Sequence, residues 1–279
     1  MKRRTWLGMT IAGVVSVAVS ACGAQQPTRR SSARSKRVAY GRDAQQFGEL
    51  HLPPGGATPK GVVVVIHGGF WLAEYTYSLG SPLATSLAEH GWAAWNIEYR
   101  RVGDGGGDPA TMNDIAAAID KVADLGLPPD TLKTVVALGH SAGGQLAGFA
   151  ASRGRFAEWS PVKVELTHVI AQAGVMDLRS GYTSDLGNGA VENFLGHPPG
   201  PGDDRIDPIF QVPLAQPVWC VHGEADTTVP PSQSTSYVAA ATSAGATATF
   251  VPVPGDHFAL ITTTSSAWRR ILDIIDSIR

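Results

Sequence analysis

Ser141 has the surroundings of a nucleophile. It lies in GHSAGG, between the apolar run TVVAL and the segment QLAGFAAS. The pattern G-x-S-x-G between a strand and a helix is typical of a sharp turn that exposes a serine hydroxyl. A hydroxyl is a poor nucleophile unless a base, usually a histidine oriented by an acid, removes its proton. We therefore predict that Ser141 is a nucleophile rather than an ordinary turn residue.

The base and the acid are expected in loops that follow later strands. His257 lies in GDHF, after the run TATFVPV, and Asp226 lies in HGEADTTVP, after PVWCVHG. The chain order serine, acid, histidine is a known order for such a catalytic triad. Glu224 is the second candidate for the acid. Asp256 is less suitable because it adjoins the histidine in sequence, and Asp177, after another strand, is a third alternative.

The segment HGGFW, which contains two glycines, directly follows the apolar run GVVVVI. Small residues at this position allow backbone N–H groups to face a substrate oxygen that gains negative charge during acyl transfer. The predicted donors to this oxyanion are the N–H groups of Gly68, Gly69 and Ala142. Phe70 and Trp71 either border the substrate pocket or belong to the core, and the sequence favours neither alternative.

Alternating strand and helix patterns would hold these residues in place. Continuous apolar runs predict buried strands, and the segments between them have helical patterns. This alternation predicts an α/β fold with a mostly parallel sheet and helices on both faces. Strands are expected at 40–53, 61–67, 92–99, 134–138, 168–174, 217–223 and 247–253, and helices at 77–91, 109–126, 143–152, 231–245 and 265–278. The irregular segment 178–216 is expected to form a short cap over the strand ends.

The first 22 residues have the pattern of an export signal. A basic start precedes an uncharged apolar run from Thr5 to Ala21, which is short for a membrane span of roughly 20 residues. The sequence VSAC resembles a bacterial lipobox. This resemblance implies that Cys22 is lipidated and anchors the chain to the outer face of the bacterial cell membrane. A plain secretory signal cut near Ala24 and a membrane helix are the alternatives.

Charge separates the N-terminal region from the rest of the 279 residues. Residues 1–37 contain eight Lys or Arg and no acidic residue, and residues 23–37 are expected to form a polar, basic tether. Residues 38–279, the predicted single domain, contain 14 basic and 24 acidic residues, a net charge of −10. This charge argues against a nucleic-acid partner. Cys220 lies in an apolar run and is expected to be a buried free thiol.

Five motifs together resemble the α/β-hydrolase superfamily: HGGFW, IEYRR, GHSAGG, HGEADTTVP and GDHF. They are similar to its esterase branch, which includes hormone-sensitive-lipase-like esterases, feruloyl-esterase-like proteins and kynurenine formamidases. The resemblance covers about residues 38–279. It implies an α/β-hydrolase fold, no metal, no cofactor, and hydrolysis of a small-molecule ester or formamide through an acyl-enzyme.

One departure from these families leaves the substrate open. Hormone-sensitive-lipase-like members usually have HGGG and a substantial N-terminal cap, whereas this chain has HGGF and lacks that cap. HGGFW is closer to the formamidase-type HGGYW. The first expectation is an esterase for a small or aryl substrate. The alternatives are an arylformamidase and a non-catalytic binding lipoprotein, and the complete set of Ser141, Asp226 and His257 argues against the latter.

Overall fold

The computed structural model describes residues 34–278 of the chain. The expected signal segment, Cys22 and most of the expected tether lie outside the described residues. The first described element, β1 (Arg34–Ala39), pairs antiparallel with β2 (Phe47–Leu52), from Arg34 opposite Leu52 to Ala39 opposite Phe47. The tether predicted to reach residue 37 is therefore wrong for residues 34–37, which belong to the folded body.

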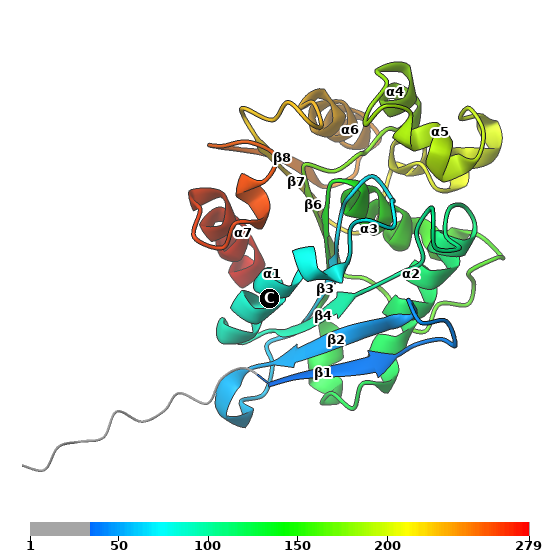
Figure 1. Cartoon of the computed structure of the whole chain (residues 1–279). Coiled ribbons are helices and arrows are strands. Elements are labelled where there is room, and N and C mark those ends of the chain that lie inside the picture. The colour runs from blue at the N-terminus through cyan, green and yellow to red at the C-terminus, as the bar shows by residue number, and fades with distance from the viewer. Residues whose placement is uncertain (1–33, 279) are drawn as a thin grey trace, which may run out of the picture. The chain divides into compact units, whose positions relative to one another are not determined.

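The described strands form one sheet in the order β1-β2-β4-β3-β5-β6-β7-β8. The two pairings of β2, with β1 and with β4, are antiparallel, and every pairing from β4 to β8 is parallel (Figure 1). The parallel strands are β3 (Val62–Ile66), β4 (Ala93–Ile97), β5 (Val135–His140), β6 (His168–Gln172), β7 (Val218–Gly223) and β8 (Ala248–Val253).

Strand β3 shows why the sheet is covered on both faces. All five residues of its sequence VVVVI are buried, and successive side chains of a strand point to opposite faces. Val62, Val64 and Ile66 belong to one hydrophobic core cluster, whereas Val63 and Val65 belong to the other. A strand without a polar face requires an apolar layer on each side of the sheet.

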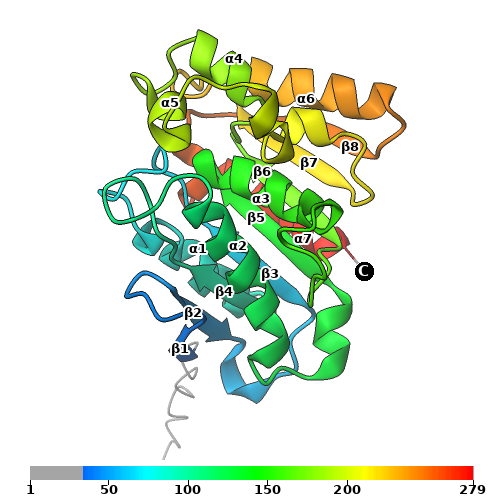
Figure 2. The ribbon, with the colours of Figure 1, turned by 90° about the vertical axis from the view of Figure 1, so that its right-hand side faces the viewer.

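Helices supply these two layers. Residues of α1 and α7 pack in the cluster with Val63, and residues of α2, α3 and α6 pack in the cluster with Val62 (Figures 1 and 2). The predicted fold class, a mostly parallel sheet with helices on both faces, is confirmed. The covering helices are α1 (Ser81–Glu89), α2 (Ala110–Asp120), α3 (Ala142–Ser152), α6 (Ser232–Ser243) and α7 (Ser266–Ser277).

Short 3₁₀ helices join the main elements. They span Pro54–Gly56, Tyr77–Leu79, Lys121–Asp124, Pro129–Lys133, Arg153–Arg155, Pro201–Arg205, Pro208–Gln211 and Ala259–Ile261. Within residues 34–278, no helix is both long enough and apolar enough to cross a membrane.

Residues 178–216 lie between β6 and β7 and contain two short α-helices. These are α4 (Leu178–Thr183) and α5 (Ala190–Leu195), which lie together at one end of the body (Figure 2). The segment is tied to α3, because the Gln145 side-chain amide donates to the carbonyl of Ile206 over 2.7 Å. We call residues 178–216 the cap segment.

A buried carboxylate holds the start of the cap segment. Asp207 is 1% exposed, and both of its carboxylate oxygens accept from the N–H of Leu178 at 3.1 Å. Burial raises the pKa of Asp207 to about 7; the nearby Asp177 adds to this rise, and the N–H of Leu178 opposes it. The folded state therefore binds this proton more tightly than the unfolded chain, in which an aspartate has a pKa of about 3.9.

Asp207 should make stability depend on pH. Its contribution to the free energy of unfolding is most favourable below about pH 4. This contribution falls by up to about 4 kcal/mol as the pH rises to 7. Asp207→Asn should remove this loss, so urea unfolding at pH 4.5 and pH 7.5 should give a smaller difference in free energy of unfolding than in the wild type. Asp124→Asn, at an exposed carboxylate, is the control and should keep the wild-type difference. An unchanged difference in Asp207→Asn would contradict the prediction.

Candidate active site

The residues predicted to do chemistry meet at one edge of the sheet. Ser141 directly follows β5, Asp226 follows β7, and His257 follows β8. Gly68 follows β3 in the same way. Carboxyl ends of parallel strands lie at a common edge, which is where open α/β sheets bind their ligands. Residues separated by more than a hundred positions are therefore brought together by the strand directions alone.

Ser141 is held in a strained turn between β5 and α3. Its φ is 56° and its ψ is −120°, a conformation that residues other than glycine rarely adopt. The N–H of Ser141 donates to Gln172 at 2.9 Å, and its carbonyl accepts from Gly144 at 2.8 Å and from Val175 at 3.2 Å. These bonds to neighbouring segments fix the turn, as strained residues at functional sites require.

The turn leaves room for glycine alone at Gly143. A Cβ atom there would lie 2.2 Å from the carbonyl oxygen of Ile66 in β3. The first turn of α3 therefore lies directly against the end of β3. This close approach brings the segment after β3 beside Ser141, where the predicted oxyanion donors are needed.

Asp226 and His257 form a buried hydrogen-bonded pair. His257 Nδ1 donates to Asp226 Oδ2 over 2.7 Å, and the exposed fractions of the two residues are 4% and 6%. The other carboxylate oxygen, Oδ1, accepts from the N–H groups of Thr228 at 2.8 Å and Val229 at 2.9 Å. The carboxylate is fixed in direction, so it selects the ring orientation of His257.

The three alternative candidates for the catalytic acid make no hydrogen bond to the His257 side chain. Glu224 and Asp256 are exposed, and Asp256 accepts from the N–H groups of Phe258 and Ala259 in its own turn. Asp177 accepts from the N–H of Ser180 at the start of α4. The geometry therefore brings Asp226, and none of the three rivals, into hydrogen-bond contact with His257.

Two further histidines support this pair, although the sequence analysis gave them no role. His222 Nε2 lies 2.9 Å from the Val229 carbonyl and 3.3 Å from Asp226 Oδ2. Because both neighbours are acceptors, this nitrogen carries a proton and donates. Burial raises the pKa of Asp226, but the hydrogen bonds from His222, His257 and the N–H of Val229 outweigh burial and hold it well below its usual range.

His140 links the serine turn to the histidine loop. Its Nε2 donates to the backbone carbonyl of His257 at 3.0 Å, and the two imidazole rings lie 4.5 Å apart. Burial, followed by the electrostatic effect of the neighbouring His257, lowers the pKa of His140 to about 3, so the side chain stays neutral and can keep a single N–H donor. The residue before Ser141 thus contacts the backbone of the base.

The predicted oxyanion donors lie beside the serine. A Cβ atom on Gly68 would lie 2.6 Å from the His140 carbonyl oxygen and 2.9 Å from the Ser141 Cβ, so the two segments are in direct contact. Ala142 is the first residue of α3, where helix N–H groups have no partner within the helix. Within residues 34–278, no backbone carbonyl accepts a hydrogen bond from the N–H groups of Gly68, Gly69 or Ala142. These three N–H groups are therefore available to a substrate oxygen.

The two aromatic residues after the glycines have different surroundings. Trp71 is fully buried, stacks on Phe194 with ring centroids 4.6 Å apart, and donates from Nε1 to Gln145 at 3.1 Å. Trp71 is therefore a core residue, so of the two alternatives that the sequence left open for it, a place at the border of the substrate pocket is wrong. Phe70 is only partly buried and stays a candidate for a residue that borders the substrate.

Two exposed aromatic side chains near the site were missed in the sequence. Phe258 is 58% exposed, and its ring meets the His257 ring edge-on at 5.4 Å. Tyr75 is 40% exposed and packs over Gly69, where an added Cβ would lie 2.2 Å from the Tyr75 Cβ. The adjacency of Phe258 to the predicted base was the available signal for one of them. Large apolar groups in solvent beside a reactive centre are suited to contact a substrate.

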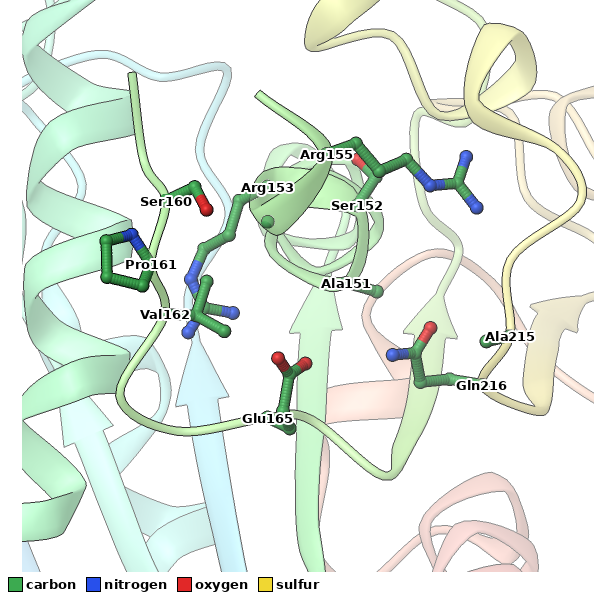
Figure 3. Close-up of a pocket in the computed structure, with 11 residues that line it drawn as sticks. Ala151, Ser152, Arg153, Arg155, Ser160, Pro161, Val162, Glu165, Ala215 and Gln216 are labelled. Atoms are coloured by element: carbon green, nitrogen blue, oxygen red, sulfur yellow. The ribbon is translucent and has the colours of Figure 1, made fainter. Parts of the chain in front are cut away.

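A separate cavity of about 350 Å³ lies at the opposite edge of the sheet. It is formed where α3 ends and where the chain enters β6 and β7 (Figure 3). The buried Arg153 lines it and donates to Asp120 at 2.9 Å and to the Val164 carbonyl at 2.6 Å. None of the predicted catalytic residues lines this cavity. The candidate active site is therefore the group around Ser141.

Comparisons with known proteins connect this site to a family. The family model described as BD-FAE matches residues 49–240, a range that includes Ser141 and Asp226. The chain is 29% identical over 254 residues to Esterase LipQ of Mycobacterium tuberculosis, covering 84% of this chain and 59% of LipQ. It is 30% identical over 141 residues to an Acetyl-hydrolase of Streptomyces hygroscopicus, covering 43% of this chain and 44% of the relative. The chain spans less than two thirds of the length of these relatives.

Solved structures show the same fold. Esterase B from Lactobacillus rhamnosis superimposes with a TM-score of 0.76 at 22% identity, covering 88% of this chain and 85% of the other. A truncated carbohydrate esterase from gut microbiota superimposes with a TM-score of 0.73 at 22% identity, covering 90% of this chain and 98% of the other. The predicted α/β-hydrolase fold is therefore confirmed.

The choice of acid can be tested by paired substitutions. Asp226→Asn removes the negative charge that faces His257, so kcat/KM for a p-nitrophenyl ester should fall by about a hundredfold or more. Glu224→Gln, at an exposed carboxylate two residues away, should change kcat/KM by less than about twofold. The reverse ranking would assign the role to Glu224. Thermal unfolding of both variants would show that each is folded at the assay temperature.

Proposed function

The chain belongs to the BD-FAE family, and we propose that it hydrolyses carboxylic esters through a serine acyl-enzyme. The observation that carries this proposal is the buried Asp226–His257 pair, which His140 joins to the strained turn at Ser141, with unpaired N–H groups beside the serine. The names of the relatives, Esterase LipQ and Acetyl-hydrolase, support hydrolysis of an ester.

In the proposed first step, the Ser141 hydroxyl oxygen attacks the ester carbonyl carbon. His257 accepts the hydroxyl proton, and Asp226 stabilises the imidazolium that forms. The carbonyl oxygen becomes an oxyanion that accepts hydrogen bonds from the N–H groups of Gly68, Gly69 and Ala142. Each such donor contributes about 3 kcal/mol to stabilisation of the transition state.

The intermediate collapses when His257 gives the proton to the leaving alcohol oxygen. The C–O bond to the alcohol breaks, and the acyl group stays on Ser141. A water molecule then attacks the acyl carbon while His257 accepts its proton, and the carboxylic acid leaves as the serine hydroxyl is restored.

We propose that the substrate is a small or aryl ester. The exposed rings of Phe258 and Tyr75 beside the site, together with the partly buried Phe70, support an apolar or aromatic group on the substrate. The second candidate function is arylformamidase activity, which is favoured by the similarity of HGGFW to HGGYW. A binding protein without activity has no use for a strained serine turn with an oriented histidine.

We also propose that the protein is exported and anchored at the outer face of the bacterial membrane through a lipid on Cys22. The lipobox-like VSAC supports this. Full-length protein expressed in a bacterium fed an alkyne-tagged fatty acid should be labelled, and Cys22→Ala should not. Cys220→Ala, which removes a buried thiol of the folded body, is the control and should be labelled like the wild type. Labelling of Cys22→Ala would rule out the anchor.

The proposed reaction and its substrate can be tested together. We expect the full chain to have a higher kcat/KM for a short-chain p-nitrophenyl ester than for N-formylkynurenine. Ser141→Ala should lower the preferred activity by roughly 10³-fold or more, because no other group supplies the nucleophile. A preference for the formamide would favour the second candidate function. Full activity in Ser141→Ala would exclude the serine mechanism.

A further inference from the structure

A buried carboxylate that takes no part in the proposed reaction lies just after β4. Glu98 is 1% exposed and belongs to the motif IEYRR, whose role the proposed mechanism does not explain. Burial of a carboxylate is unfavourable unless charged or hydrogen-bonded groups compensate it. The partners of Glu98 therefore indicate what the surrounding structure gains from it.

Glu98 joins the two ends of the segment that carries the oxyanion donors. We call residues 67–77 the oxyanion loop. Glu98 Oε1 accepts from Nε2 of His67, the first loop residue, at 2.9 Å. Oε2 accepts from the N–H of Tyr77, the last loop residue, at 3.0 Å. Oε1 also accepts from the N–H of Tyr99 and lies 3.0 Å from Arg101.

The residues that follow Glu98 hold the middle of the oxyanion loop. The guanidinium of Arg101, which is 1% exposed, donates to the Tyr75 carbonyl and to Asp104. Val102 donates from its N–H to the Trp71 carbonyl at 2.9 Å, and its own carbonyl accepts from the N–H of Ala73 at 3.0 Å. The loop is therefore fixed by one segment at its start, middle and end.

His67 transmits the position of Glu98 to a predicted donor. Its Nδ1 donates to the Gly68 carbonyl at 2.8 Å while Nε2 donates to Glu98. Both partners are oxygens that only accept, so a ring nitrogen that bonds to either of them acts as the donor. In a trans peptide the C=O and the next N–H point in opposite directions. A Gly68 carbonyl turned toward His67 therefore directs the Gly69 N–H away from His67.

The oxyanion loop needs such restraints because its backbone is strained. Phe70 and Trp71 have φ values of 54° and 57°, which persist only where surrounding contacts fix them. Burial raises the pKa of Glu98, but the hydrogen bond and charge of His67, the N–H of Tyr77 and the charge of Arg101 lower it more. The net effect is a lowered pKa, so Glu98 remains the carboxylate that these donors require.

We propose that Glu98 is a positioning residue that holds the oxyanion loop so that the Gly69 N–H faces the developing oxyanion. This inference rests on the proposed esterase function. The Gly69 contact strengthens as negative charge develops, so it stabilises the transition state more than the bound ester. Loss of Glu98 should therefore lower kcat and leave KM nearly unchanged.

The test is Glu98→Gln in the full chain, which keeps the size of the side chain but removes its charge. We expect kcat for a p-nitrophenyl ester to fall roughly 10- to 100-fold, because one oxyanion donor loses its alignment, with KM within about twofold. The rate of Ser141 labelling by a fluorophosphonate should fall in parallel, since that reaction also develops charge on an oxygen in the oxyanion site.

The matched control is Asp120→Asn. Asp120 pairs with the buried Arg153, which lines the cavity in Figure 3 at the opposite edge of the sheet. The pair resembles that of Glu98 with the buried Arg101. Loss of this pair should lower stability and leave kcat and the labelling rate unchanged. If Glu98→Gln does not fold, Glu98→Asp keeps the charge but is one methylene too short to contact both His67 and Tyr77, and kcat should again fall.

The outcomes separate the two proposals. An active wild type whose kcat and labelling rate are unchanged in the Glu98 variants would overturn the positioning role alone. An equal loss of kcat in Asp120→Asn would also overturn the positioning role, because the effect would then follow from lost stability. A rise in KM at unchanged kcat in the Glu98 variants would overturn it as well. A wild type that neither hydrolyses esters nor reacts with the fluorophosphonate would overturn the proposed function and this inference with it.

Discussion

The turn at Ser141, where β5 passes directly into α3, is the constraint on which the site depends. The left-handed backbone of Ser141 is stable only because its N–H and carbonyl are both bound by neighbouring segments. The same turn requires Gly143 to approach the end of β3 closely. The loops after β3, β7 and β8 then contribute to one site because their strands end at the same edge.

Two buried carboxylates organise the groups around this turn, and both are saturated with donors. Asp226 accepts from two backbone N–H groups and from His257, and Glu98 accepts from two backbone N–H groups, His67 and Arg101. A buried charge with so many donors has one favourable orientation, since any other leaves a charge or an N–H unpaired. Asp226 thereby orients the proposed base, and Glu98 orients the loop of the proposed oxyanion donors.

Most of the fold followed from local pattern, and the exceptions depend on distant parts of the chain. The run VVVVI predicts a strand buried on both faces whatever its neighbours are, and the structure agrees. The polar sequence RSKRVA has no such signal, and it forms β1 because β2 offers a free edge. The contact of Glu98 with His67 depends on β4 lying beside β3, which the chain order does not specify. Trp71 is buried by Phe194, more than a hundred residues later.

The burial of Trp71 also connects the oxyanion loop to the cap segment. Its Nε1 donates to Gln145 Oε1, and the amide nitrogen of Gln145 donates to the Ile206 carbonyl in the cap segment. The Trp71 ring stacks on Phe194, which belongs to α5. The oxyanion loop is therefore held by Glu98 from the sheet and by Gln145 and Phe194 from α3 and the cap segment. Since both supports act on residues 67–77, the cap segment helps to set the geometry of the groups proposed to stabilise the transition state.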